Sequence, residues 1–308
     1  MSSIYHNKFF AMGTRFNAIL PGLDSEEGDR VFQLIKREIS RIEGKLTRFR
    51  PDSDVSEMNR IAKSHQCELD DELFDIMKAC VWCSGITGGA FDVTLRPLME
   101  YWKNKHQGKQ PDHEWEELRK SLGMHHIHLD EANKTIKFSS SQLEVDLGGF
   151  GKGYALEKIR EMIDNVRVTC AFISFGESSV LALGNHPAGG AWKIGINDYT
   201  KPGLPAYRFE VIDGSVSTSS NFYVADDGTL KNHLHVIDPV TGLPVDQCVS
   251  VSVMAQSPVL AEMMSTAFLV MADEKIYEVL DQYEGMEAVK INYESGEAQI
   301  ILFDKINS

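Results

Sequence analysis

The sequence predicts an α+β fold in which mainly antiparallel sheets pack with several helices. Short segments that alternate apolar and polar residues dominate residues 170–253, and this pattern is typical of strands. A few long segments with helical periodicity are interleaved with these strands. Runs of strands with only a few helices among them favour antiparallel sheets over a doubly wound parallel sheet.

The first elements follow from periodicity and capping signals. Residues 9–20 alternate as a single strand would. Ser25 is the predicted N-cap of a helix whose apolar stripe stops near Gly44. Residues 46–54 are predicted to form a loop, because they contain a Pro-Asp-Ser turn signal.

The later elements are predicted in the same way. A helix covers residues 70–84, a Gly-Gly break precedes the segment 91–102, and residues 127–138 form a strand that turns at residues 131–134. Further strands are predicted at residues 143–146, 170–175, 179–183, 191–196, 207–212 and 233–237. Helices are predicted at residues 154–163 and 258–271, and the chain ends with one more helix and a hairpin of residues 288–293 and 298–303.

Length and composition predict one globular domain. The chain has 308 residues, of which 43% are hydrophobic and 25% charged, values that are ordinary for a soluble protein. The polar stretch 103–113 reads as a surface loop and not as a domain boundary. We therefore expect a single domain over residues 1–308.

Charge and cysteine content exclude several classes of protein. The formal net charge of -14 argues against a general nucleic-acid or anionic-membrane binder, because both need a basic surface. The five cysteines are an odd number in a long chain, so a disulfide framework is not expected. Cys80 and Cys83 lie in an apolar-periodic segment, which favours two core residues over a redox pair. The first residues lack an apolar signal segment, and no stretch is apolar enough to span a membrane, so a cytoplasmic location is expected.

The densest chemical signal is the glycine-rich segment 146–155, which reads DLGGFGKGYA. Glycines let the backbone approach a ligand closely, and the segment leads from a predicted strand into a helix N-terminus, which favours anions. Lys152 adds a positive charge for a phosphate. The spacing fits neither a Walker A motif nor a dinucleotide fingerprint. By itself the segment is equally compatible with a tight turn beside a solvated lysine.

Two further clusters carry candidate site residues. Glu262 and Thr266 are four residues apart on one helix face and offer hard oxygen ligands suited to magnesium, although such pairs are also common on helix surfaces. Residues 235–244 (HVIDPVTGLP) contain two turns that place His235 and Asp238 at a strand edge, where they could face a ligand or form an Asx-type turn. Residues 215–223 are rich in hydroxyls, as phosphate or ribose recognition requires, or as an ordinary polar strand contains.

Taken together, these segments resemble the ApbE family of flavin transferases. Six segments of the chain match family motifs in the same order and cover nearly its whole length, and the ordered set is far more specific than any one motif. They are residues 11–14, 47–60, 88–98, 146–155, 235–244 and 260–268. The resemblance implies an ApbE-like, T-fold-like architecture.

The resemblance also implies an activity, which is the magnesium-dependent transfer of FMN from FAD to a Ser or Thr hydroxyl of an acceptor flavoprotein, with release of AMP. FAD is then a substrate, Mg²⁺ is the cofactor, and the acceptor carries a short Ser/Thr-Gly-Ala-x-Ser/Thr type of motif. An FAD pyrophosphatase that gives FMN and AMP is one alternative, and a non-catalytic FAD-binding protein is another. The sequence predicts no nucleic-acid partner and leaves a homodimer open.

Family positions map onto this chain residue by residue. FAD contacts are implied for Met12, Phe49, Ala90, Phe91, Asp92, Asp146, Lys152, Glu177, Thr218 and Val236. The metal site maps to the Gly149 carbonyl and to the side chains of Glu262 and Thr266. Lys152 would neutralise charge during the reaction, and His235 and Asp238 are the candidates for positioning or deprotonating the acceptor hydroxyl.

The chain departs from the family pattern at a few of these positions. Gly149 and Gly151 stand where alanines are usual, and Ser220 stands where a glycine is usual. Glu262 replaces the usual aspartate. Its carboxylate lies one methylene further from the backbone, so the geometry around a bound magnesium ion must adjust.

Overall fold

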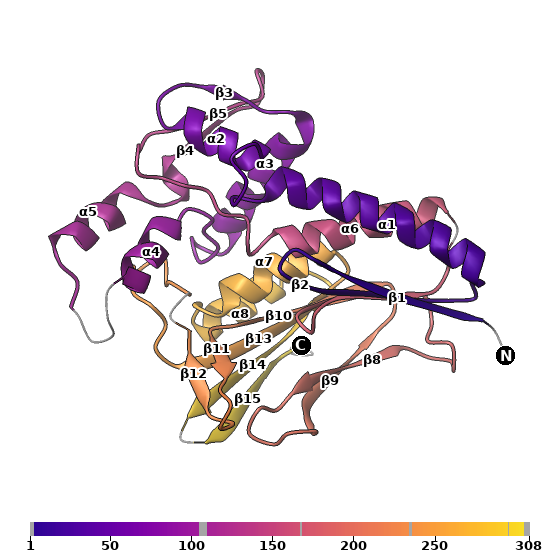
Figure 1. The fold of residues 1–308 in the computed structure, drawn as a ribbon. Coiled ribbons are helices and arrows are strands. Elements are labelled where there is room, and N and C mark those ends of the chain that lie inside the picture. Colours follow the sequence, from indigo (N-terminus) through magenta and orange to yellow (C-terminus); the bar gives the residue numbers. More distant parts are fainter. Residues whose placement is uncertain (1–2, 105–109, 167, 234–235, 295, 305–308) are drawn as a thin grey trace.

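The computed structural model describes residues 3–104, 110–166, 168–233, 236–294 and 296–304 (Figure 1). Within these residues, eight strands form one antiparallel sheet in the order β1-β2-β6-β7-β10-β13-β14-β15. The strands are β1 (Ile4–Ala11), β2 (Thr14–Pro21), β6 (Ala171–Phe175), β7 (Ser179–Leu183), β10 (Gly214–Ser220), β13 (Cys248–Ala255), β14 (Glu287–Glu294) and β15 (Glu297–Phe303).

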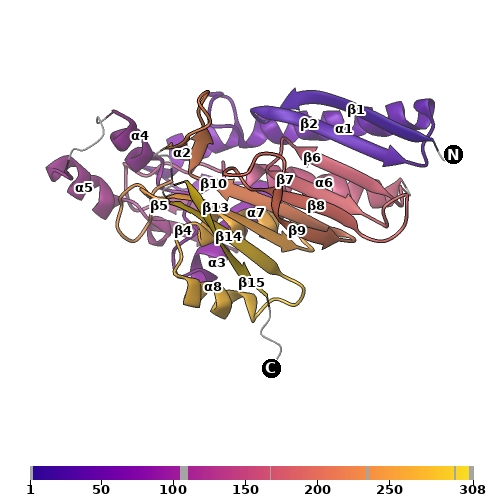
Figure 2. The ribbon, with the colours of Figure 1, turned by 90° about the horizontal axis from the view of Figure 1, so that it is seen from below.

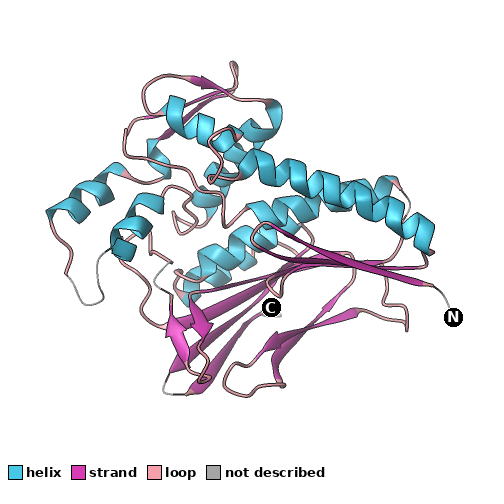
Figure 3. Cartoon of the chain, viewed as in Figure 1, coloured by secondary structure: helices cyan, strands magenta, loops and turns pink. Residues whose placement is uncertain are grey.

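Helices cover one face of this sheet in layers (Figures 1 and 3). Helix α7 (Pro258–Phe268) packs on β10 and β13, α6 (Gly151–Asn165) packs on α7, and α1 (Ser25–Leu46) packs on α6. The apolar stripe of α1, which includes Ile35, Ile39 and Ile42, is fully buried. Helix α8 (Asp273–Leu280) lies against β15.

A two-stranded hairpin covers part of the other face of the sheet (Figure 2). It consists of β8 (Trp192–Asn197) and β9 (Pro205–Val211). Trp192 and Phe209 pack with the sheet residues Val216 and Ile291 in a second buried cluster. Strand β7 is buried along its whole length, because the sheet is covered on both sides at its centre.

A smaller group of elements lies at one end of the helical layer (Figure 1). It contains α2 (Asp54–Ala62), α3 (Asp71–Ile86), α4 (Arg96–Asn104), α5 (His113–Ser121), a short 3-10 helix (Met124–His126) and a sheet of β3 (Cys67–Glu68), β5 (Thr135–Phe138) and β4 (Ile127–Asp130). The indole N–H groups of Trp102 and Trp115 both donate to the Gly242 carbonyl, each at 3.0 Å. Trp102 belongs to α4 and Trp115 to α5, so these two helices anchor the turn at Gly242 within the segment 235–244.

Two short strands, β11 (Phe222–Val224) and β12 (Leu230–Asn232), form a separate ribbon beside the end of β10. Measured over the described residues, no helix combines membrane-spanning length with enough apolar character.

The structure confirms the α+β class, the antiparallel pairing and most of the predicted elements. Cys80 and Cys83 are buried in α3, as the apolar periodicity predicted. The C-terminal hairpin is also confirmed as β14 and β15, and the predicted helix after residue 258 is α7.

Several boundaries in the first half of the chain were predicted wrongly. Residues 9–20 are the facing parts of two strands, which a turn at Met12 and Gly13 separates. The N-cap of α1 is Asp24, whose carboxylate accepts from the Glu27 N–H at 2.9 Å, and Ser25 is the first helical residue. The two-residue turn shifts the alternation by one residue, so the inward-facing residues are odd-numbered in β1 (Phe9, Ala11) and even-numbered in β2 (Phe16, Ala18). The prediction of one strand overlooked this shift.

Other errors concern short elements. Helices α2 and α5 were not predicted, and in the segment 91–102 the helix begins only at Arg96. Residues 143–146 form no strand beyond an isolated bridge between Leu95 and Glu144. In the predicted strand 233–237, residues 234 and 235 lie outside the described residues, and Ile237 forms an isolated bridge with Pro244.

Gly153 should be essential for the packing of α6 on α7. A Cβ atom at this position would lie 2.6 Å from both Glu262 Cβ and the Pro258 carbonyl oxygen. We expect Gly153→Ala to lower the free energy of unfolding by about 1–3 kcal/mol through overpacking. The matched control is Gly85→Ala, because Gly85 is also helical and has nothing within 4 Å of such a Cβ. The control should be neutral or stabilising by up to about 1 kcal/mol, and equal losses in urea unfolding for both variants would contradict the packing argument.

Candidate active site

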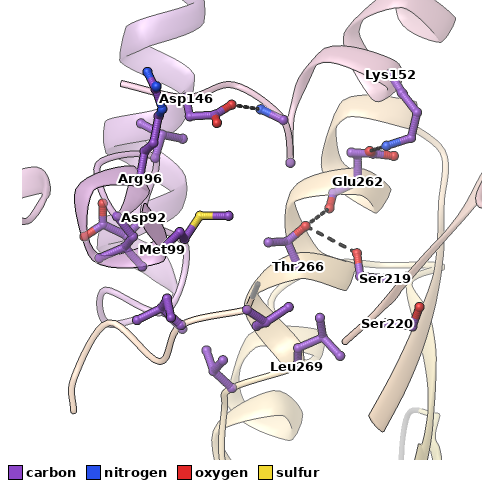
Figure 4. A pocket seen from close by; sticks show the side chains of 18 of the residues that line it. Asp92, Arg96, Met99, Asp146, Lys152, Ser219, Ser220, Glu262, Thr266 and Leu269 are labelled. Carbon is purple, nitrogen blue, oxygen red and sulfur yellow. Dashed lines mark hydrogen bonds and ion pairs between the residues drawn. The ribbon is translucent and has the colours of Figure 1, made fainter. Parts of the chain in front are cut away.

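A cavity of about 470 Å³ opens where the start of α6, helix α7, the end of β10 and residues 90–99 meet (Figure 4). One wall carries Asp92, Arg96 and Met99, and the facing wall carries Lys152, Glu262 and Thr266. Its lining mixes apolar and polar side chains, as ligand pockets usually do. The lining residues are Ala90, Asp92, Val93, Leu95, Arg96, Met99, Asp146, Gly148, Gly149, Lys152, Thr218, Ser219, Ser220, Val236, Ile237, Glu262, Thr266, Leu269 and Val270.

The centre of the polar wall is a buried ion pair. The Lys152 Nζ atom lies 2.6 Å from Glu262 Oε1, and Glu262 is only 3% exposed. The pair joins the first turn of α6 to α7, and the missing side chain of Gly153 is what allows the two helices to approach so closely. A buried charge is costly unless it is paired and hydrogen-bonded, and this carboxylate is both.

The sheet below α7 supplies the remaining partners of Glu262. The hydroxyls of Ser179 and Ser217 donate to Oε2 at 2.7 Å and 2.8 Å. These two serines are directly opposite each other in the β7–β10 register, so the antiparallel pairing brings both hydroxyls to the same point. Both are at most 2% exposed, and charge-assisted hydrogen bonds of this kind are strong.

Thr266 and Gly149 form the next part of the wall. The Thr266 hydroxyl donates to the Glu262 carbonyl at 3.1 Å and lies 3.3 Å from the Ser219 hydroxyl. A Cβ atom at Gly149 would lie 3.1 Å from Thr266 Oγ1, so the loop before α6 passes directly over this hydroxyl. Ser265 continues the hydroxyl cluster with a contact of 2.9 Å to Ser219.

Asp146 begins the glycine-rich loop and organises the cavity rim. Its Oδ1 accepts from the Gly148 N–H at 2.9 Å, and its Oδ2 lies 2.6 Å from Arg48 Nε. The Arg48 guanidinium also stacks on the ring of Phe49, 4.1 Å from its centroid. Phe49 is 79% exposed and does not line the cavity, so it presents a large apolar ring to solvent with one face covered by a cation.

Asp92 lies on the opposite wall. Burial raises its pKa to about 6, although the Thr94 backbone N–H and hydroxyl both donate to Oδ1 at 2.7 Å and act in the opposite direction. The neighbouring Arg96 is held by Glu144, with 2.7 Å between Nη1 and Oε2. This wall therefore carries a carboxyl group whose pKa burial raises to about 6 and a guanidinium that Glu144 holds in place.

The structure brings most of the sequence-predicted site residues to this one cavity. Nine of them line it, and they are Ala90, Asp92, Asp146, Gly149, Lys152, Thr218, Val236, Glu262 and Thr266. The three predicted metal-site positions are among them, although Gly149 lies in the loop before α6 and Glu262 and Thr266 lie on α7, far away in the sequence.

The other predicted residues lie elsewhere. Phe91 is buried behind the wall at 1% exposure, and Met12 sits at the tip of the β1–β2 turn, where its Cε would be 3.2 Å from a Cβ on Gly151. Glu177 lines a separate hollow, and Asp238 lines a neighbouring cavity of about 420 Å³ that shares Ala90 and Val270 with the first. His235 lies outside the described residues.

Sequence reasoning missed several residues that shape the site. Arg48, Arg96 and Met99 carry no signal of their own. Ser179 and Ser217 were not predicted as partners of Glu262, although the alternating serines of β10 indicated that one face of this strand is polar. Only the sheet register, which local patterns do not specify, could have paired the two serines.

The residues present fit a hard divalent cation. Glu262, Thr266 and the Gly149 carbonyl offer oxygen donors, and such a cation would keep water or phosphate oxygens at its other positions. Over the described part of the chain, no cluster of three or more His, Cys, Asp or Glu side chains is arranged to hold a metal. The Lys152 ammonium group forms an ion pair with Glu262 Oε1, the oxygen to which a divalent cation would have to bind.

The fold and the site together define an α+β protein whose pocket is suited to a phosphorylated ligand. The model of the ApbE family matches residues 12–290, and the chain belongs to this family. A curated relative from Klebsiella pneumoniae (strain 342), named FAD:protein FMN transferase, is 28% identical over 93% of this chain and 88% of its own length. A relative of the same name from Escherichia coli (strain K12) is 25% identical over 92% and 82%.

Solved structures show the same fold. The ApbE protein of Thermotoga maritima superposes with a TM-score of 0.82 at 25% identity and covers 98% of this chain and 97% of its own. A flavin transferase ApbE from Vibrio cholerae superposes with a TM-score of 0.84 at 22% identity, with the same coverage. The architecture expected from the resemblance is therefore confirmed.

The raised pKa of Asp92 makes stability depend on pH. Its folded-state pKa of about 6 lies above its ordinary value of 3.8, so the folded protein binds more protons than the unfolded chain between these values. Stability should fall as pH rises through this window. We expect Asp92→Asn to gain up to about 3 kcal/mol over wild type above pH 6, at about 1.4 kcal/mol per pKa unit, and little below pH 4.

Asp198 provides a matched control for this titration. Its Oδ1 accepts from the Thr200 backbone N–H and hydroxyl in the same way, at 2.9 Å and 2.6 Å. Burial raises its pKa, but these hydrogen bonds outweigh burial and the net pKa is lowered. Asp198→Asn should therefore destabilise the protein above pH 4. Urea unfolding from pH 4 to pH 8 tests both signs, and a stability difference for Asp92→Asn that is independent of pH would refute the interpretation.

Proposed function

We propose that this protein transfers FMN from FAD to a hydroxyl of an acceptor protein and releases AMP. The observation that carries the proposal is the family membership of a chain whose cavity places Lys152, Glu262 and Thr266 together at the start of α6. Curated relatives with this name match over most of the chain.

In the proposed reaction, the FAD pyrophosphate binds at the glycine-rich start of α6. The free backbone N–H groups of a helix N-terminus favour anions, and Lys152 adds a mobile positive charge. Asp146 and Thr218 are proposed to contact FAD hydroxyl or amine groups. The exposed ring of Phe49, together with Met12, Ala90, Phe91 and Val236, is proposed to provide apolar surface for the ring systems.

The chemical step exchanges the phosphoanhydride bond of FAD for a phosphoester bond on the acceptor hydroxyl. The acceptor oxygen forms a bond to the FMN-side phosphorus, the bridging P–O bond breaks, and AMP leaves with the electron pair. Asp238 and His235 are proposed to position the hydroxyl and take its proton. Magnesium held by Glu262, Thr266 and the Gly149 carbonyl would supply charge neutralisation on the pyrophosphate.

The finer features of the partner are also proposals. The acceptor is proposed to present a Ser or Thr within a short flavinylation motif, because an oriented hydroxyl has a large advantage over loosely held water. Glu177, which lines a separate hollow, remains a proposed FAD contact, and a cytoplasmic location and a homodimer remain proposals. The single-domain organisation is supported by one buried cluster that contains residues from Ala11 to Phe303.

The transfer can be tested directly. Purified protein, FAD, Mg²⁺ and a redox protein that carries the acceptor motif should give an acceptor heavier by one FMN, stable to denaturation, with an equal amount of AMP. Replacing the acceptor Ser or Thr by Ala should abolish the labelling. Equally fast FAD cleavage without acceptor, and no labelled protein with several acceptors, would instead favour the pyrophosphatase. FAD binding with neither cleavage nor labelling would favour a binding protein.

The role of Glu262 can be tested separately. Glu262→Gln keeps the size but removes the charge that a cation needs, so we expect the transfer rate to fall by at least about 100-fold, or roughly 3 kcal/mol. Glu262→Asp, which has the form usual in the family, should stay active. The control is Glu161→Gln on the outer face of α6, where the exposed carboxylate pairs with Lys158. A Glu262→Gln enzyme with wild-type rate and metal dependence would show that the metal site lies elsewhere.

A further inference from the structure

The Lys152 ammonium group and the proposed divalent cation would both bind Oε1 of Glu262. Lys152 Nζ lies 2.6 Å from Glu262 Oε1. The proposed function, on which this inference rests, requires a divalent cation on the same carboxylate. The other oxygen is not available, because Oε2 already accepts from the buried hydroxyls of Ser179 and Ser217. A cation that binds Glu262 must therefore take the place of Lys152 on Oε1.

The two partners of the ion pair differ in their freedom to move. The Glu262 side chain is 4% exposed and is anchored to the sheet, whereas the Lys152 side chain is 23% exposed and borders the cavity. Lys152 also lies in the first turn of α6, where the helix dipole disfavours a cation. Its ammonium group can swing into the cavity, and the carboxylate cannot follow it.

We propose that Lys152 is an internal competitor of the divalent cation for Glu262. Without the cation, the ammonium group neutralises the buried carboxylate and keeps α6 and α7 together. When the cation binds Oε1, the ammonium group is released into the cavity, at the helix N-terminus where the FAD phosphates are proposed to lie. Ser179 and Ser217 are positioning residues that keep the carboxylate in place in both states.

The competition has a measurable consequence for affinity. A site that is free in only a fraction of molecules binds its ligand more weakly by that fraction. If the pair is formed in about nine of ten molecules, removing Lys152 should tighten binding of the cation about tenfold. A residue that merely helped to hold the cation or FAD would not produce this gain.

The first experiment measures binding of Mn²⁺ alone, followed by electron paramagnetic resonance, because manganese accepts the same oxygen ligands as magnesium. Lys152→Met should bind Mn²⁺ about tenfold more tightly than wild type. The matched control is Arg96→Met, which removes a cation from the same cavity but not from Glu262. Its effect should be much smaller and should vanish at high ionic strength, because it acts only through space.

The second experiment uses the wild-type protein and does not depend on a variant that folds. Lysine labelling by a succinimidyl ester, followed by mass spectrometry without FAD, should modify Lys152 several-fold faster when Mg²⁺ is added, because the ammonium group leaves its carboxylate. Lys158 provides the internal control, because it lies on the same helix and pairs with an exposed glutamate. Its labelling should not change.

Specific results would overturn the inference. They are Mn²⁺ binding by Lys152→Met that is no tighter than wild type, an equal gain in Arg96→Met, or Lys152 labelling that Mg²⁺ leaves unchanged. If FMN transfer occurs and any of these results is found, the competition is wrong and the proposed function stands. If both experiments give the expected results but no FAD cleavage or transfer occurs, the proposed function is wrong and the competition stands.

Discussion

The close approach of α6 to α7 is the constraint on which the site depends. Gly153 has no side chain, and the two helices meet there at a distance that any Cβ atom would prevent. This contact places Lys152, at the start of one helix, directly over Glu262 in the other. A buried carboxylate needs compensation for its lost hydration, and the sheet and the lysine supply it together. Among the described side chains, no buried nitrogen or oxygen atom is left without a hydrogen-bond partner. The polar centre of the site is therefore part of the core and not an addition to its surface.

The sequence predicted the elements whose signals are local. The helix after Pro258 and the C-terminal hairpin have caps, turns and periodicities that act over a few residues. The glycines and the lysine of the loop before α6 are also a local pattern, and they indicated a ligand-binding segment. Residues 9–20 were misread as one strand because the turn at Met12 and Gly13, both with positive φ, has no strong signal in the sequence. It moves the inward-facing positions from odd numbers in β1 to even numbers in β2. Helix α5 was missed because it buries no residue completely, so it lacks the apolar stripe by which helices are predicted.

The parts of the site that could not be predicted are those set by long-range register. Ser179 and Ser217 face each other only because β7 and β10 pair antiparallel in one register, and a shift of either strand by one residue would place the two hydroxyls on opposite faces of the sheet. The hydrogen bonds from the Trp102 and Trp115 indoles to the Gly242 carbonyl are another example, because these residues lie more than a hundred positions from Gly242 in the sequence. Such contacts depend on how whole elements pack, and no window along the chain contains both partners.

The departures from the family pattern become coherent within this geometry. The extra methylene of Glu262 lets one carboxylate contact both the sheet serines and Lys152. A side chain one methylene shorter would not extend far enough to contact both at once. Gly149 in place of alanine keeps a methyl group away from Thr266 Oγ1, which it would approach to 3.1 Å. Glu262 therefore occupies more of the site on the side of α7, and Gly149 leaves more room on the side of the loop.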